Sequence, residues 1–187
     1  MAEEKKRRGR RDHLNDFYRD VSGNYVYTGV CYEHTGGVRA NAALLRRLWP
    51  MATAMAAAVV TGGCISAPGV GRCFYVLLPY AAQLGVTGSI VWAVARWQVR
   101  EYPLREYVYR ATVQALPGRC LAQAILAGVG LAAETLYLLL SGSDGHGAAA
   151  AIYLLLQACV LALALLARRA VLAGDWQPEE RNGLTTE

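Results

Sequence analysis

The sequence predicts an all-α integral membrane protein, a four-helix transmembrane bundle with both termini in the cytoplasm. Of its 187 residues, 55% are hydrophobic and only 18% are charged, a balance too apolar for an ordinary soluble domain. The charges are also segregated, so that four stretches reach the ~20 residues that cross a bilayer. Three of these stretches contain no charged residue, and the fourth contains only Glu134. This pattern excludes a disordered chain, a disulfide-stapled secreted domain and a cytosolic enzyme.

The four spans define a transmembrane domain over residues 46–171. Short connections between them favour an antiparallel arrangement. The first span is the weakest, because it is rich in alanine and carries Pro50 in its first turn. We expect the spans near 46–67, 73–96, 119–140 and 148–169.

Basic residues predict the orientation, because short loops rich in Lys and Arg stay on the cytoplasmic side. Of 19 Lys and Arg residues, ten precede the first span, five lie between the second and third, three follow the fourth, and only Arg72 falls on the other side. Both termini should therefore be cytoplasmic. The same count favours four spans over three, because without the first span the loop with five Arg residues would lie outside. A compact chain without a targeting addition favours the bacterial plasma (inner) membrane, although the charge bias suits a eukaryotic membrane equally.

Residues 1–11 form a basic tail that we expect to be disordered. Contact with anionic lipid headgroups, at about 1 kcal/mol for each Lys or Arg, accounts for such a tail without nucleic acid as a partner. Residues 12–45 should form a cytoplasmic juxtamembrane segment. Apolar residues at helical spacing over 12–21 predict a short amphipathic helix, which could lie on the membrane or dock on a partner.

The next part of this segment, residues 24–34, is rich in β-favouring types and predicts a small hairpin or one extended strand. An isolated hairpin is marginal in water, so it needs support from its own chain, another protomer or a different protein. Tyr25, Tyr27 and Tyr32 are the candidates for docking a partner. A plain juxtamembrane linker explains the segment about as well.

Two other polar segments are expected on the cytoplasmic side. Between the second and third spans, apolar residues share one face over residues 103–116, which predicts an amphipathic helix in the headgroup plane. Such a helix either completes a connection or couples the bundle to a soluble protein. The tail over 172–187 is too short to fold alone, and Trp176 is its expected anchor at the membrane surface.

Glu134 is the one ionisable residue well inside a span, and a carboxylate in hydrocarbon must face protein or water, or be protonated. Small and polar residues share its helical face, which should point into the bundle. These residues are Gln123, Ala127, Gly130, Glu134 and Tyr137. Polar residues recur on the neighbouring spans as Tyr80, Gln83, Tyr153 and Gln157, with Arg72 at the membrane edge.

Two interpretations of this polar set are open. In one, Glu134 binds a proton, cation or amine in a hydrated cavity and changes protonation during transport. In the other, Glu134 is protonated or paired with Arg72 or Tyr80, and the glutamines join helices with about 0.6 to 2 kcal/mol each.

The five cysteines form no C-x-x-C pair, so the sequence predicts neither a zinc site nor a redox motif. Cys64 and Cys73 flank the same outer turn and are either a disulfide or two separate thiols. No catalytic or nucleotide-binding motif occurs, and we expect no metal, no cofactor and no enzymatic activity.

The sequence favours a non-enzymatic membrane subunit, either an accessory protein of a larger complex or a homo-oligomer. The reason is that much of its polar sequence forms a cytoplasmic surface that cannot stand alone. The alternative is a small transporter of a solute, cation or proton, in which Glu134 couples transport and Tyr80, Gln83, Tyr153 and Gln157 line the path.

Overall fold

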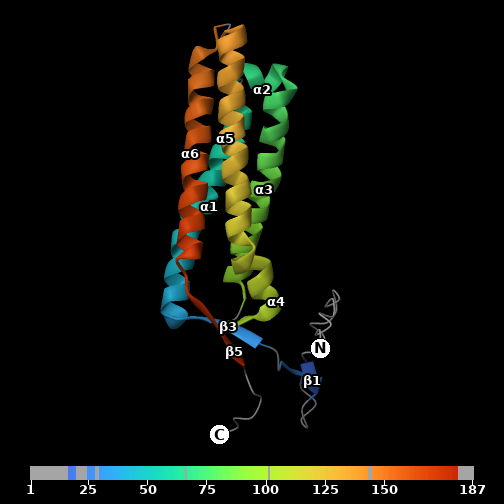
Figure 1. Cartoon of the computed structure of the whole chain (residues 1–187), viewed down its shortest axis with the longest axis vertical. Coiled ribbons are helices and arrows are strands. Elements are labelled where there is room, and N and C mark those ends of the chain that lie inside the picture. Colours follow the sequence, from blue (N-terminus) through green and yellow to red (C-terminus); the bar gives the residue numbers. More distant parts are fainter. Residues whose placement is uncertain are drawn as a thin grey trace, which may run out of the picture.

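The computed structural model describes residues 17–19, 25–27, 30–65, 67–100, 102–142 and 145–180. Within these residues, four long helices form a bundle (Figure 1). Each is long and apolar enough to cross a membrane, as the sequence predicts. The helices are α1 (Gly37–Cys64), α3 (Phe74–Gln98), α5 (Leu116–Ser141) and α6 (Gly147–Leu172).

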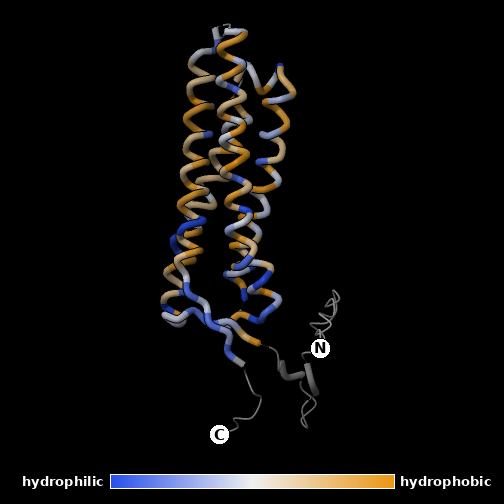
Figure 2. Tube along the Cα trace, viewed as in Figure 1, coloured by the Kyte–Doolittle hydropathy of each residue, from blue (hydrophilic) through white to orange (hydrophobic). Residues whose placement is uncertain are grey.

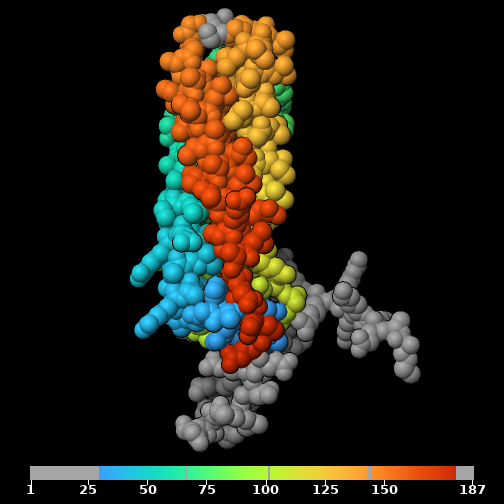
Figure 3. All heavy atoms as spheres, turned by 60° about the vertical axis from the view of Figure 1, so that its left-hand side comes forward, coloured from blue at the N-terminus to red at the C-terminus, as the bar shows by residue number. Residues whose placement is uncertain are grey.

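The four helices run up and down in chain order. Helices α1 and α5 occupy opposite corners, and each packs against both α3 and α6. Figure 3 shows α1 and α6 side by side along much of their length. The short helix α2 (Pro68–Arg72) caps one end of the bundle, and short strands lie at the other. We name these the α2 end and the strand end, and the adjoining parts of the bundle the α2 half and the strand half.

Apolar residues predominate along the four long helices, whereas the trace at the strand end is more hydrophilic (Figure 2). Phe74, Leu139 and Leu155 are 77%, 78% and 71% exposed, on three different helices. Water would disfavour so large an apolar surface, whereas bilayer hydrocarbon covers it at no cost. The architecture is that of a polytopic integral membrane protein.

The first helix is longer than the predicted span. Helix α1 begins at Gly37 rather than near residue 46, and its 28 residues would extend about 42 Å. Because hydrocarbon is only about 30 Å thick, about 12 Å of the helix, including the turn that carries Arg39, projects beyond it. Hydropathy marks the apolar stretch of a helix and does not mark where the helix starts.

The predicted in-plane helix over 103–116 is not formed as one amphipathic helix. Strand β4 (Leu104–Arg105) is followed by α4 (Glu106–Tyr109) and by a π-helical turn, η2 (Arg110–Gln114), that leads into α5. Its apolar residues Leu104 and Val108 are buried in the protein core. The spacing correctly identifies apolar residues on one face, but it cannot tell whether protein or lipid covers them. In this structure the protein core covers them.

Three segments far apart in the sequence form a small sheet at the strand end. Strand β3 (Val30–His34) lies between β4 and β5 (Trp176–Glu180), and both neighbours are antiparallel to it. Tyr32 pairs with Pro178 in β5 and with Leu104 in β4. The C-terminal tail is therefore not a bare anchor, because its first part completes this sheet.

The prediction of a helix over 12–21 is wrong at its centre. Strand β1 (Phe17–Arg19) pairs antiparallel with β2 (Tyr25–Tyr27), and the remainder of the predicted helix lies outside the described residues, as does the tail over 1–11. Residues 24–34 thus contribute to two sheets, β2 to the first and β3 to the second. Aromatic residues at helical spacing also suit strands, and pairing with β2 decides the outcome.

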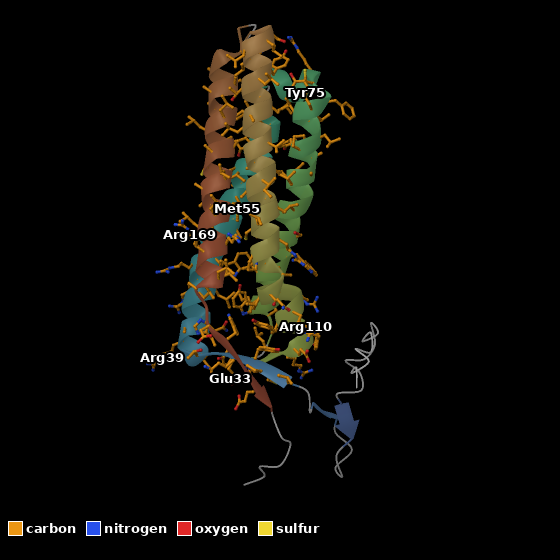
Figure 4. All side chains as sticks on the ribbon, viewed as in Figure 1. Glu33, Arg39, Met55, Tyr75, Arg110 and Arg169 are labelled. Carbon is orange, nitrogen blue, oxygen red and sulfur yellow. The ribbon has the colours of Figure 1, made fainter. Side chains whose placement is uncertain are left out.

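The strand half has a dense apolar core. Leu48, Met55, Ile90 and Trp97 are at most 2% exposed and belong to one cluster with residues of α4, η2 and α5. Figure 4 shows Met55 in the interior, while Arg39 and Arg169 lie on the outside. This core joins the four helices to the sheet below them.

Candidate functional site

Six buried or nearly buried polar side chains succeed one another in the interior of the bundle, from its middle to the α2 half. We name them the polar ladder. They come from α3, α5 and α6: Gln83, Thr87, Gln123, Glu134, Tyr153 and Gln157. Glu134 and Gln123 are eleven residues apart on α5, so the ladder extends about 16 Å along the bundle.

The middle of the ladder is a closed hydrogen-bonded group. The Gln83 amide nitrogen donates to Gln157 Oε1 at 2.8 Å, and Gln157 Nε2 donates to Gln83 Oε1 at 3.1 Å. Gln157 Nε2 also donates to the Tyr153 hydroxyl at 2.8 Å. This group joins α3 to α6 across the bundle.

A second link joins α3 to α5. Gln123 Nε2 donates to the Thr87 hydroxyl at 2.9 Å. Gln123 Oε1 is buried and has no hydrogen-bond partner in the described part of the chain. A buried amide oxygen without a partner costs roughly 1–3 kcal/mol, so this layer is incompletely satisfied.

Glu134 lies at the top of the ladder and is completely buried, with 0% of its surface exposed. Its Oε1 accepts a hydrogen bond from the backbone N–H of Gly69, in α2, at 3.2 Å. Its Oε2 is buried and has no hydrogen-bond partner among the described residues. Helix α2 therefore closes directly over a carboxyl group that is only half satisfied.

Glycine makes this contact possible. A Cβ placed on Gly69 would lie 2.1 Å from Glu134 Oε2 and 2.9 Å from Cδ. The same holds at Gly63 of α1, where a Cβ would lie 1.9 Å from the Tyr80 hydroxyl. That hydroxyl donates to the carbonyl of Val59 at 3.2 Å, so it links α3 to α1.

The sequence-predicted face of α5 is buried, as its spacing predicts, and Tyr137 lies on it above Glu134. Tyr153 of α6 lies within electrostatic range of Glu134. Neither expected partner pairs with the carboxylate: Tyr80 bonds the Val59 carbonyl, and Arg72 is exposed and forms no ion pair with Glu134. The partner that sequence reasoning missed is Gly69, whose only signal is a glycine-rich connection after span one.

Of the two alternatives that the sequence leaves open for Cys64 and Cys73, the structure has two separate thiols. Cys64 is exposed, Cys73 is partly buried, and both are free thiols in the structure. Helix α2 lies between them and separates the end of α1 from the start of α3. Because the connection contains a short helix, it holds Cys64 and Cys73 differently from the single outer turn that the sequence suggests.

The docking tyrosines separate into two groups. The ring of Tyr32 stacks on Tyr109, with 4.1 Å between ring centres and 4° between planes. Trp176, the expected membrane anchor, packs edge-on against Trp97 at 5.7 Å and His34 at 5.3 Å. Tyr25 and Tyr27 lie in β2, and their side chains are outside the described part of the chain.

The Tyr102 hydroxyl connects these strands to the loop before β4. It accepts a hydrogen bond from the backbone N–H of His34 at 3.0 Å. Burial is the main cause that raises the pKa of Tyr102 above its ordinary value, while the His34 contact lowers it. The strand end is thus a packed part of the fold.

An apolar groove of about 340 Å³ lies between α1 and α3, on the outside of the bundle. Trp92 and Val60, which line it, are 69% and 56% exposed. The groove is separate from the carboxyl site, because Glu134 has no exposed surface. In the described residues, no three His, Cys, Asp or Glu side chains lie close enough to hold a metal ion.

Comparison with protein-family models, curated proteins and solved structures finds no match to this chain.

Proposed function

We propose that this protein is a small membrane carrier in which Glu134 binds a proton, a small cation or another small cationic solute. The observation that carries the proposal is the completely buried carboxyl group with an unpartnered Oε2. A charged or half-satisfied carboxyl group at this depth is costly, and residues of this kind in membrane proteins mark ion and proton pathways. No catalytic step is part of the proposal.

The polar ladder supports a path on one side of the site. Tyr153, Gln157 and Gln83 continue from Glu134 toward the middle of the bundle; Gln157 bonds Tyr153 within α6 and Gln83 of α3 across the bundle. Beyond Gln123 the interior becomes the apolar core of the strand half. The carrier therefore opens to one side at a time, with α2 and this core as its two barriers.

For orientation, we propose that the strand end faces the cytoplasm of a bacterial plasma membrane. Of the described arginines from Arg39 onward, ten lie in the helix turns near the strand end or in the segment 100–110, whereas Arg72 alone lies at the α2 end. Short basic segments stay on the cytoplasmic side. Both chain ends then face the cytoplasm, and α2 faces outward.

The test is transport by purified protein in sealed liposomes. Wild type should dissipate an imposed gradient of protons, Na⁺ or K⁺, and Glu134→Gln should abolish this flux while expression and native mass stay unchanged. The matched control is Thr135→Val, because Thr135 is the next residue on α5, is exposed, and bonds only its own helix. Equal flux in wild type and Glu134→Gln would reject the proposal.

The second candidate is an accessory subunit or homo-oligomer that docks through its strand end. What favours it is the β1–β2 pair, because a two-stranded sheet alone is marginal in water. Strand β3 of the predicted cytoplasmic surface needs no partner protein to complete its sheet, because it pairs with β4 and β5 of this chain. For this reason we rank the subunit below the carrier.

Native mass after mild detergent extraction tests this second candidate. A docking role predicts that replacing Tyr25 and Tyr27 with Ser releases a stoichiometric partner or dissociates an oligomer, while membrane insertion stays unchanged. Tyr32→Ser is the matched control, because that ring is already occupied by Tyr109. Recovery of the wild type as a monomer without a partner would exclude this role.

A further inference from the structure

The surroundings of Glu134 indicate which ligand it binds and which element controls access to it. We propose that the ligand is a proton taken up from the α2 end, and that α2 is the gate that closes when the proton binds. This inference rests on the proposed carrier function and names its ligand. One proton adds to Oε2, no bond breaks, and no group leaves.

The surroundings of the carboxyl group favour a proton over a metal ion. Hard cations take about six or more oxygen ligands at roughly 2.0 to 2.6 Å. In the described structure Glu134 is the one acidic side chain at this site, and Gly69 fills the space beside Oε2. The nearest amides and Tyr80 already bond one another or the backbone. A proton needs neither further ligands nor space.

The groups that face Glu134 supply no compensating positive charge in the described structure. Helix α2 presents the Gly69 backbone, and its one basic residue, Arg72, is exposed and forms no ion pair with Glu134. The titratable groups of the other elements near the site are thiols or phenols, which carry no positive charge in either protonation state: Cys64 of α1, Cys73, Tyr75 and Tyr80 at or in α3, Tyr137 of α5 and Tyr153 of α6.

The closed position of α2 therefore suits the neutral acid. With a proton on Oε2, Glu134 keeps a carbonyl oxygen that accepts from Gly69 N–H, and no charge is buried. When the proton leaves, the carboxylate is buried with one oxygen unsolvated, which is costly. Water must then reach Oε2, and only displacement of α2 opens the site, because the Gly69 backbone lies directly against it.

Accessibility of Cys73 measures the position of α2, because this residue immediately follows the helix. The variant Cys64→Ser, Cys159→Ser lacks the two exposed cysteines, and Cys31 and Cys120 are buried. In this protein, reconstituted in vesicles, we expect the labelling rate with a membrane-impermeant maleimide to fall as the pH is lowered. The fall should approach about tenfold per pH unit, the limit for one bound proton. Each rate is divided by that of the same protein unfolded at the same pH, which removes the titration of the thiol.

Two variants fix the gate in its two positions. Glu134→Gln is neutral and keeps the acceptor for Gly69 N–H, so Cys73 should keep the low labelling rate of the closed position, in which it is partly buried, at every pH. Gly69→Ala places a Cβ on Oε2, so Cys73 should react at every pH. In parallel, the infrared carboxyl band of wild type minus Glu134→Gln should show one acid that titrates over the pH range of the labelling change.

The outcomes separate this inference from the carrier proposal. If Na⁺ or K⁺ controls labelling and pH does not, the ligand is a metal cation and the inference fails, while Glu134-dependent flux still supports the carrier. An infrared band that titrates with constant Cys73 labelling overturns the gate. If band and labelling both follow pH but no flux is found, the inference stands and the carrier proposal fails.

Discussion

The strand half and the α2 half of the bundle are packed with chemically different side chains. The strand half is filled by large apolar side chains such as Trp97, Leu48 and Met55, and it rests on a sheet and an aromatic cluster. The α2 half is filled by small residues and polar groups, among them Gly63, Gly69 and Glu134. The strand half is a closely packed apolar core in which Trp176 Nε1 has no hydrogen-bond partner among the described residues, whereas the α2 half buries a carboxyl group whose Oε2 has none.

The energetic character of the halves differs accordingly. Inside a membrane, helices gain little from apolar burial, because lipid is as apolar as the core. Close packing and hydrogen bonds across helices must hold them together. In the strand half, large side chains fill the space between the helices. In the α2 half, glycines allow close contacts and amide side chains bond one another. The two halves should therefore respond differently to the same kinds of substitution.

The largest effect is expected in the strand half, from Trp97→Ala. Trp97 is 1% exposed, donates to Asn41 Oδ1 at 3.1 Å and packs on Trp176. Removing its ring should lower the free energy of unfolding by about 3–5 kcal/mol, measured by titrating detergent-solubilised protein with SDS. Trp92→Ala is the control, because Trp92 is 69% exposed, and it should change the free energy little. Similar losses for both variants would contradict the contrast between core and lipid-facing surface.

A smaller effect is expected in the α2 half, from Gly63→Ala. The added Cβ would lie 1.9 Å from the Tyr80 hydroxyl and break its bond to Val59. We expect a loss of about 1–3 kcal/mol in the free energy of unfolding, the usual cost of overpacking. Gly85→Ala is the matched control, because no atom lies within 4 Å of its added Cβ. Alanine suits a helix better than glycine, so this control should be neutral or stabilising, and a loss equal to that of Gly63→Ala would refute the close-contact argument.

The amide pair of the ladder predicts non-additive effects. Gln157→Leu leaves the Gln83 amide without its partner, and should cost about 1–3 kcal/mol in the free energy of unfolding. The double variant Gln83→Leu, Gln157→Leu removes both amides, and it should be more stable than the single variant. The four proteins of the double-mutant cycle are compared under one set of conditions. Strictly additive losses would show that the pair is not a bonded unit.

The smallest effect is expected at the strand end, from Tyr32→Leu. Leucine keeps an apolar side chain in β3 but removes the ring that stacks on Tyr109. The free energy of unfolding should fall by about 0.5–1.5 kcal/mol, the usual value of an aromatic pair. Tyr32→Phe is the control and should retain most of the stability, since it keeps the stacked ring. Equal losses in both variants would assign the effect to the hydroxyl group.

Much of the bundle follows from local properties of the sequence. Four apolar stretches long enough for a membrane predict the four long helices, and the spacing on α5 predicts its buried face, including Glu134 and Gln123. Both signals depend on residues close together in the chain. Hydropathy and helical periodicity can therefore be read without knowledge of the fold.

The sheet and the closure of the site were decided by the tertiary structure. Strand β5 forms because β3, more than 140 residues earlier, offers it a paired edge, and its own sequence contains Pro178 and no alternation of apolar residues. Tyr32 and Trp176 pack on other aromatic residues of the same chain. For Tyr32 this is one of the three supports that the sequence leaves open, and the sequence could not choose among them.

The contact between Gly69 and Glu134 also could not be predicted from the sequence. The sequence alone identified Glu134 as a buried carboxyl group, because one acid in an apolar stretch is a local fact. That the backbone of α2 lies on it depends on contact between Gly69 and a residue 65 positions later in the chain. Local composition determined which groups lie in the membrane, and only long-range packing decided which of them touch, since contact between distant segments has no signature in either segment alone.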